Sequence, residues 1–525
     1  MIQNPILRGF NPDPSIVRVG DDYYIATSTF EWFPGVQIHH SRDLKHWRLL
    51  THALTRTSQL NMAGNPDSGG VWAPCLTYDD GLFYLIYTDV KSRNGAFKDT
   101  HNYLVTAKAI EGPWSEPIYL NSSGFDPSLF HDEDGRKWLV NMLWDHRAAH
   151  NSFAGIVLQE YCNEQKKLIG PRKNIFLGTP LKSTEGPHVY KRNGYYYLML
   201  AEGGTRYEHA VSMARSTSID GPYETDPLNP MLTSAGRREL PLQKSGHGCL
   251  VETQNAEWAL VHLVGRPVAE DRCILGRETA VQKVVWTEDG WLRLAEGGNA
   301  PQSEVRTFNL PEYPFKPEPE TDHFTDKELS VHWSTLRLPQ DESWLTLTER
   351  PGFLRLRGRE SLSSLHRQTL VARRQQSMYC EAETELEFAP EHQQQMAGLI
   401  LYYDTRDYVY MRVSRDEQLG KCLGIVSSVN GKWTEYPETE ISIEGSESCR
   451  LKVIIEGSQA QFYYSLDQGA WSPLGMGINI LHLSDEAGEF LKFTGNFIGM
   501  CVQDLSGTGQ AADFDYFRYS EQRQP

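Results

Sequence analysis

Three carboxylic acids lie in short motifs of similar build that are far apart in the sequence. Asp13 and Asp126 each precede a proline, and Glu185 precedes a glycine and a proline. Taken one at a time, such motifs are typical of turns. If the chain brings the three together, their mutual repulsion raises the pKa of at least one of them. A protonated acid beside an ionised base is the pair that cleaves a glycosidic bond, and a third carboxylate can tune that pair.

The three carboxylates share a sequence register with two further segments. The five segments begin at Asp13, Ala73, Asp126, Glu185 and His247. Each is followed by a polar or glycine-containing turn and then by a run rich in β-branched and aromatic residues, as in a β-hairpin. These runs are Tyr23–Thr27, Leu82–Tyr87, Trp138–Met142, Tyr195–Leu200 and Trp258–Leu263. Five repeats of about 60 residues with almost no helical periodicity predict a five-bladed β-propeller.

A propeller architecture would bring these distant motifs together. The innermost strand of each blade lines a central channel, so the five aligned positions are expected to meet near the propeller axis. Three of those positions are the carboxylates. The shared register therefore favours a functional cluster over a set of unrelated turns.

Aromatic and basic residues accompany the predicted inner strands. They are Phe30, Trp72, Trp144, His247 and Arg277. Flat aromatic faces and a cation with several donors suit a neutral polyhydroxylated ring. The alternatives are core packing for the aromatic residues, a buried histidine at His247 and a structural ion pair at Arg277.

The second half of the chain has a different pattern. Four prolines between Pro311 and Pro319 predict a semi-rigid linker. Alternating strands follow it, again without helical signal, and predict an antiparallel two-sheet sandwich. We therefore expect an all-β protein with a propeller over residues 1–305, a linker over 306–321 and a β-sandwich over 322–525.

Composition limits the kinds of binding partner and the cellular compartment that we expect for this protein. The formal net charge is −17, which disfavours nucleic acid and acidic membrane surfaces as partners. The chain starts without a basic and apolar leader and has no run of about 18 apolar residues, so we expect a cytoplasmic protein. The eight cysteines are dispersed without a C-x-x-C pair and are expected to be reduced.

At its motifs the chain resembles glycoside hydrolase family 43, in particular the two-domain β-xylosidases of that family. The similar segments are Asn11–Ile16, Tyr23–Tyr24, Val71–Pro74, Gly124–Leu129, Thr184–His188 and Gly276–Thr279. The resemblance covers the whole chain. It implies a five-bladed propeller, a C-terminal concanavalin-like or lectin-like sandwich and an inverting mechanism.

The resemblance also implies roles for individual residues. Asp13 corresponds to the general base, Glu185 to the general acid, and Asp126 to the residue that tunes the pKa of the acid and orients it. The pocket for the terminal sugar would be lined by Phe30, Trp72, Trp144, His247, Arg277 and, from the second domain, Phe497. Phe493 is the alternative to Phe497, because it lies four residues away and sandwich loops vary in length.

The expected activity is that of an exo-acting β-1,4-xylosidase, which releases xylose from the non-reducing end of xylobiose and short xylo-oligosaccharides. An α-L-arabinofuranosidase or a bifunctional enzyme is the nearest alternative, because the two sugars can present their hydroxyls similarly. A non-catalytic sugar-binding propeller is the alternative from another class, although binding alone does not need an acid and a base. The resemblance also makes a homodimer or homotetramer plausible.

No cofactor is expected, because the sequence has no H-E-x-x-H, EF-hand, P-loop or dinucleotide glycine motif. Some members of the family hold a calcium ion. The run Ala512–Tyr519 is similar to the last strand of other calcium-binding sandwiches, which makes Asp513 and Asp515 candidate ligands for a structural calcium. The alternative is an edge strand with solvated aspartates.

Overall fold

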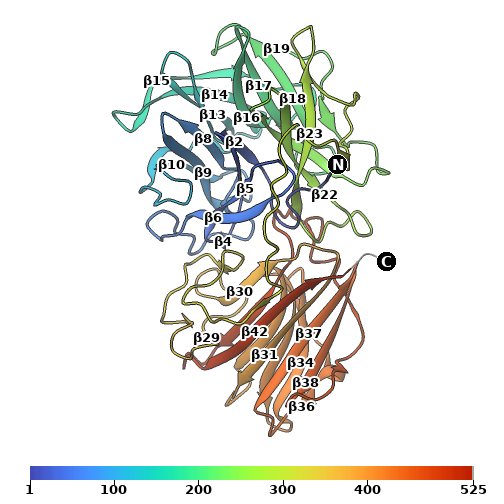
Figure 1. The fold of residues 1–525 in the computed structure, drawn as a ribbon. Coiled ribbons are helices and arrows are strands. Elements are labelled where there is room, and N and C mark those ends of the chain that lie inside the picture. The colour runs from blue at the N-terminus through green and yellow to red at the C-terminus, as the bar shows by residue number, and fades with distance from the viewer. Residues whose placement is uncertain (523–525) are drawn as a thin grey trace. The chain divides into compact units, whose positions relative to one another are not determined.

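The computed structural model describes residues 1–522, and its chain forms two compact units. The first unit comprises residues 1–266 and 277–315, and the second comprises residues 267–276 and those from 316 onward. Strands dominate both units (Figure 1). The one helix in the described residues is the 3-10 turn η1 (Pro437–Thr439), so no helix there is long and apolar enough to cross a membrane.

The first unit contains five antiparallel sheets of four or five strands, which are the blades of a β-propeller. The first three blades contain β2 (Ser15–Val19), β3 (Asp22–Thr27), β5 (Gly35–Ser41) and β6 (Arg48–Leu54); β7 (Gly70–Val71), β8 (Cys75–Asp79), β9 (Leu82–Ser92), β10 (Asp99–Ala107) and β11 (Ile118–Asn121); and β12 (Ser128–His131), β13 (Lys137–Trp144), β14 (Phe153–Cys162) and β15 (Lys167–Phe176). The last two contain β16 (Glu185–Arg192), β17 (Tyr195–Glu202), β18 (Ala210–Ser216), β19 (Glu224–Thr225) and β20 (Leu232–Thr233); and β21 (Gln243–Glu252), β22 (Trp258–Gly265), β23 (Arg277–Trp286) and β24 (Leu292–Leu294). The predicted five-bladed propeller is confirmed.

Hydrophobic clusters occupy the spaces between successive blades. Val140 of the third blade, for example, shares a cluster with Leu198 of the fourth, and both are fully buried. Corresponding clusters join the first blade to the second, the second to the third, the fourth to the fifth and the fifth to the first. Burying one such aliphatic side chain contributes about 1.5–3 kcal/mol, so these clusters hold the ring of blades together.

The N-terminal segment closes the ring against the last blade. Strand β1 (Ile2–Gln3) pairs with β25 (Glu304–Val305), and Leu7 forms a β-bridge with Thr279 of β23. Ile2 and Leu7 are buried in the cluster that the first and fifth blades share. The N-terminal segment therefore connects the first and fifth blades through backbone pairing and buried side chains.

The second unit is an antiparallel sandwich of two sheets. One sheet runs in the order β28 (Leu345–Thr346), β29 (Leu354–Arg357), β42 (Ala511–Glu521), β31 (Tyr379–Phe388), β37 (Ser448–Glu456), β38 (Gln459–Leu466) and β39 (Ser472–Pro473), with β26 (Thr321–Asp322) on β42 and β40 (Ile478–Asn479) on β38. The other contains β35 (Lys432–Glu435), β34 (Gly420–Val429), β33 (Asp407–Asp416), β32 (Gln395–Asp404), β41 (Phe497–Asp504), β30 (Thr369–Arg374) and β27 (Ser334–Leu336), with β36 (Ile441–Ser442) on β34. Both sheets contribute side chains to one large core, which confirms the predicted sandwich.

The first half of the proline-rich segment is attached to the first blade. The backbone N–H of Tyr313 donates a hydrogen bond to Asp43 Oδ2 at 2.7 Å. The guanidinium of Arg48 lies 4.8 Å from the centroid of the Phe315 ring. Residues up to 315 accordingly belong to the propeller unit rather than to a free tether.

The closure of the ring yields a first prediction, for the variant Leu7→Ala. Removing a buried leucine side chain leaves a cavity and should lower the free energy of unfolding of the propeller by about 2–5 kcal/mol. Urea unfolding followed by tryptophan fluorescence would measure this loss. Leu228→Ala is the matched control, because Leu228 is 65% exposed and its truncation should change stability by at most about 0.5 kcal/mol. Equal midpoints for the two variants would contradict the role assigned to the N-terminal segment.

Candidate active site

The three carboxylates lie at corresponding ends of inner strands. Asp13 precedes β2, Asp126 precedes β12, and Glu185 is the first residue of β16. All three side chains are buried. Asp13 and Asp126 have φ values of 55° and 53°, in the left-handed region that non-glycine residues seldom adopt. Such strained conformations cluster at functional sites, where the surrounding structure maintains them.

Specific hydrogen bonds separate the environments of these acids. Ser28 Oγ donates to Asp13 Oδ2 at 2.6 Å, and Arg277 Nη1 donates to Asp13 Oδ1 at 3.1 Å. The backbone N–H of Gly186 donates to Asp126 Oδ2 at 3.1 Å. Asp126 thereby holds the residue that follows Glu185. The carboxylates that the sequence aligned are brought together in space.

The environments shift the pKa values of the three groups in different directions. Burial alone would raise the pKa of Asp13, but the charge of Arg277, His247 in its protonated form and the hydrogen bond from Ser28 together lower it. Burial and the charge of Asp13 raise the pKa of Asp126. Burial, followed by repulsion from Asp126 and Asp13, raises the pKa of Glu185 well above its ordinary value. The cluster therefore combines an ionised carboxylate with a protonated acid.

A row of aromatic rings adjoins the carboxylates. The Phe30 centroid lies 6.3 Å from that of Trp72, and Phe125 lies 5.0 Å from Trp72 and 6.3 Å from Trp144. Phe10 extends the row at 5.7 Å from Phe30. Phe125 thus joins Trp72 to Trp144, and Phe10 adds a ring beyond Phe30; sequence reasoning missed both phenylalanines. A signal was available, because Phe10 and Phe125 follow a glycine and precede the two aspartate motifs.

The tryptophan rings of this row are oriented by backbone contacts. The indole N–H of Trp72 donates to the carbonyl of Ser68 at 3.0 Å, and that of Trp144 donates to the carbonyl of Ala96 at 2.8 Å. Both rings are partly buried. The Lys98 ammonium nitrogen lies 4.4 Å from the centroid of the Trp144 ring and adds a further contact that orients this side chain.

The two basic residues predicted for the site both lie beside Asp13. Arg277 is buried, and its guanidinium carbon is 5.4 Å from the Phe30 ring centroid. Arg277 forms its ion pair with Asp13 at 3.1 Å, whereas its neighbour Glu278 pairs with Arg266 at 2.6 Å. His247 Nδ1 lies 3.8 Å from Asp13 Oδ1. Burial lowers the pKa of His247, so its ring is neutral near pH 7.

Two further buried histidines lie in the same electrostatic environment. Burial lowers the pKa values of His188 and His209 to about 3, with His247 as the next cause for both. His188 belongs to the motif of Glu185, so its position carried a signal. His209 precedes β18 outside every aligned motif, and sequence reasoning missed it.

The two phenylalanines predicted from the second unit lie at strand β41 and in the segment before it. Phe497 is the first residue of β41 and is fully buried, with the Arg374 guanidinium carbon 5.1 Å from its ring centroid. Phe493 lies in the irregular segment before that strand. The contribution of Phe497 or Phe493 to a sugar pocket stays a prediction.

The structure does not support calcium binding at the candidate aspartates. Asp513 Oδ1 accepts a hydrogen bond from Arg355 at 2.7 Å, and Asp513 Oδ2 accepts hydrogen bonds from Arg350 and Arg355 at 2.8 Å each. Burial and the nearby Glu385 raise the pKa of Asp515. Within residues 1–522, no three His, Cys, Asp or Glu side chains converge on a metal position. Two guanidinium groups thus neutralise Asp513, the stronger of the two acids.

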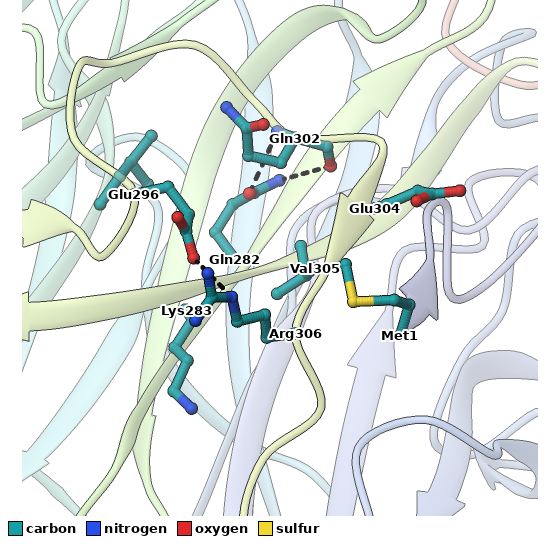
Figure 2. Close-up of a pocket in the computed structure, with 9 residues that line it drawn as sticks. Met1, Gln282, Lys283, Glu296, Gln302, Glu304, Val305 and Arg306 are labelled. Carbon is teal, nitrogen blue, oxygen red and sulfur yellow. Dashed lines mark hydrogen bonds and ion pairs between the residues drawn. The ribbon is translucent and has the colours of Figure 1, made fainter.

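A separate pocket of about 340 Å³ lies beside the outer part of the fifth blade. Figure 2 shows its lining, in which Glu296 pairs with Arg306 and Gln282 exchanges hydrogen bonds with Gln302. Its lining contains no aromatic side chain and none of the three carboxylates. It therefore lacks the chemistry expected of the sugar site.

An ionised carboxylate, a protonated acid and a row of aromatic rings at the inner strands of a five-bladed propeller define a glycoside hydrolase. Residues 2–292 match the family described as Glycosyl hydrolases family 43, and residues 321–520 match the Beta xylosidase C-terminal Concanavalin A-like domain. The chain belongs to glycosyl hydrolase family 43. The alternative of a non-catalytic sugar-binding propeller is therefore not supported.

Known proteins resemble the chain over nearly its whole length. A Beta-xylosidase of Bacillus subtilis is 52% identical, with 99% of each chain covered. A Xylosidase/arabinosidase 43B of Humicola insolens is 50% identical, covering 100% of this chain and 98% of its own. The crystal structure of a xylan beta-1,4-xylosidase from Bacillus halodurans has a TM-score of 0.99 at 62% identity, covering 99% of this chain and 100% of that one.

The contact between Arg277 and Asp13 predicts a shift in the pH dependence of hydrolysis. In Arg277→Gln the charge that lowers the pKa of Asp13 is lost, so this pKa rises. The acidic limb of kcat/KM for an aryl glycoside should then move to higher pH, by roughly one pH unit. Arg266→Gln is the control, because Arg266 pairs with Glu278 instead. An unmoved acidic limb in Arg277→Gln would contradict an electrostatic role for this arginine.

Proposed function

We propose that this protein is an inverting, exo-acting β-1,4-xylosidase that releases xylose from the non-reducing end of xylobiose and short xylo-oligosaccharides. The observation that carries the proposal is the buried cluster of three carboxyl groups, in which Ser28 and Arg277 donate hydrogen bonds to Asp13 while burial and the neighbouring acids raise the pKa of Glu185. The similarity to proteins named as β-xylosidases supports the choice of sugar.

Each carboxyl group has a role that its contacts support. Asp13, held negative by Arg277, takes a proton from the attacking water. Glu185 donates its proton to the glycosidic oxygen as the bond breaks. Asp126 accepts a hydrogen bond from the backbone N–H of Gly186 and so orients the neighbouring Glu185 through the backbone. An inverting pair leaves roughly 6.5–9.5 Å between the two carboxyl groups, which makes room for the water.

The binding residues suit a small neutral sugar. Phe30, Trp72 and Trp144 offer flat apolar faces, and neutral His247 and charged Arg277 offer hydrogen-bond donors. Hydrolysis of α-L-arabinofuranosides is the second candidate activity. It is motivated by the xylosidase/arabinosidase of Humicola insolens, and we expect it to be the slower reaction.

The compartment and the assembly remain predictions. All eight cysteines are free thiols and seven are buried, which supports a reducing compartment such as the cytoplasm. A homodimer or homotetramer and independence from any cofactor are proposed together with the xylosidase function.

Proton NMR of xylobiose hydrolysis tests the proposed function directly. The water must attack the face opposite the bond that Glu185 protonates, so α-xylose should appear first and equilibrate later with the β-anomer. An aryl α-L-arabinofuranoside at equal concentration is the comparison substrate. If β-xylose appeared first, Asp13 could not be the general base of a single displacement. Cleavage of the arabinofuranoside but not of xylobiose would exclude the proposed xylosidase function.

The variant Glu185→Gln tests the assignment of the acid. Cleavage of xylobiose should fall by about 10²–10⁴-fold, because the leaving sugar needs a proton. A dinitrophenyl β-xyloside, whose leaving group is already acidic, should retain much more activity. Asp13→Asn should lose activity on both substrates. Equal losses on the two substrates in Glu185→Gln would remove Glu185 from the role of acid.

A further inference from the structure

A fourth buried acid lies next to the general acid in the fourth blade. Glu202 is the last residue of β17 and is fully buried. In the ladder between β16 and β17, Glu185 pairs with Ala201, so Glu202 follows the partner of Glu185 by one residue. The established chemistry of the site has no role for this side chain.

The carboxylate of Glu202 accepts four hydrogen bonds. Its Oε1 accepts from the backbone N–H of Thr179 at 2.9 Å and from Thr184 Oγ1 at 2.7 Å. Its Oε2 accepts from Thr179 Oγ1 at 2.6 Å and from Ser212 Oγ at 2.5 Å. Hydrogen bonds to a carboxylate are shorter and stronger than those between neutral groups. Glu202 is thus occupied on both oxygens and ties the segment before Glu185 to strands β17 and β18.

That segment has an unfavourable backbone conformation. Lys182 and Ser183 have φ values of 66° and 51°, two consecutive left-handed residues that are not glycine. The backbone N–H of Gly203 donates to the carbonyl of Lys182 at 2.9 Å. A Cβ atom at Gly178 would lie 2.2 Å from Thr184 Oγ1, so the segment packs tightly on this threonine. Contacts outside the segment therefore maintain its shape.

Both neighbours of Glu185 are consequently held by acids. Thr184 is bound through its hydroxyl to Glu202, and Gly186 is bound through its N–H to Asp126. Because these two hydrogen bonds lie on either side of Glu185 in the chain, they restrict the position of its Cα atom. A displacement of about 1 Å at a reacting group can cost about 10²-fold in rate.

We propose that Glu202 is a positioning residue for the general acid, acting through the hydroxyl of Thr184. The proposal rests on the proposed function only in taking Glu185 as the proton donor. Glu202 itself does not contact the substrate. Its contribution is to keep the carboxyl group of Glu185 in line with the glycosidic oxygen.

The variant Thr184→Val tests this role, because it keeps the shape of the side chain and removes the donor to Glu202. Turnover of phenyl β-xyloside, which needs protonation, should fall by about 10–100-fold. Turnover of dinitrophenyl β-xyloside should fall by less than about threefold. Thr184→Ser, which retains the hydroxyl, should restore the ratio of the two rates. Glu202→Gln replaces one acceptor oxygen with a donor. It should lower turnover of the phenyl substrate relative to the dinitrophenyl substrate, by less than Thr184→Val does.

Thr384→Val is the matched control, because Thr384 is fully buried in the sandwich and its hydroxyl likewise donates one hydrogen bond, to the backbone carbonyl of Tyr516. It should leave the ratio unchanged. Thermal melts verify folding, and Thr184→Ala replaces the valine variant if that one does not fold. Equal losses on both substrates, or an unchanged ratio in the Thr184 and Glu202 variants, would overturn the proposal. If the wild-type protein cleaved only arabinofuranosides, the proposed xylosidase function would be refuted. The ratio of turnover on phenyl and dinitrophenyl arabinofuranosides would then still test the role of Glu202.

Discussion

Electrostatic repulsion among buried carboxyl groups is the constraint on which the site depends. Three acids are taken out of water together, and the guanidinium of Arg277 acts on all of them but donates a hydrogen bond to Asp13. Asp13 therefore keeps its negative charge. That charge, together with burial, favours the protonated forms of Asp126 and Glu185. Repulsion that would destabilise an ordinary core thus produces an acid and a base within one cluster.

The propeller supplies the rigidity that such a cluster needs. Asp13 and Asp126 adopt left-handed backbone conformations just before inner strands, and His247 does so within β21, each at a cost of about 1–3 kcal/mol. These conformations persist because the strands that follow them are packed on both faces by the clusters between blades. Closure of the ring by β1 and β25 completes this packing.

Acidic side chains in the fourth blade act by two different physical routes. Glu185 lies where burial and like charges favour its protonated form, so it can give up a proton. Glu202, one residue beyond the strand partner of Glu185, accepts four hydrogen bonds and so holds Thr179, Thr184 and Ser212. The four hydrogen-bond donors that face the carboxyl group of Glu202 distinguish it from Glu185.

The sequence by itself determined the architecture and singled out three carboxylates as one set. Strand-forming runs, turns and the aspartate and glutamate motifs recur with one period, and a repeat of this kind is visible without knowledge of tertiary contacts. It placed Asp13, Asp126 and Glu185 in one register, and the structure brings them together. The short glycine-phenylalanine signals before Asp13 and Asp126 were also present, although Phe10 and Phe125 were not recognised as part of the aromatic row.

Only the tertiary structure decided which acid is ionised, what holds each of them and which candidates lie elsewhere. The hydroxyl of Ser28 and the carboxylate of Glu202 carry no motif, and their roles arise from hydrogen bonds to residues distant in the chain. Asp513 looked like a calcium ligand in the sequence, but its oxygens face Arg350 and Arg355. A pKa and a hydrogen bond depend on burial and on partners distant in the chain, which no local pattern of residues specifies.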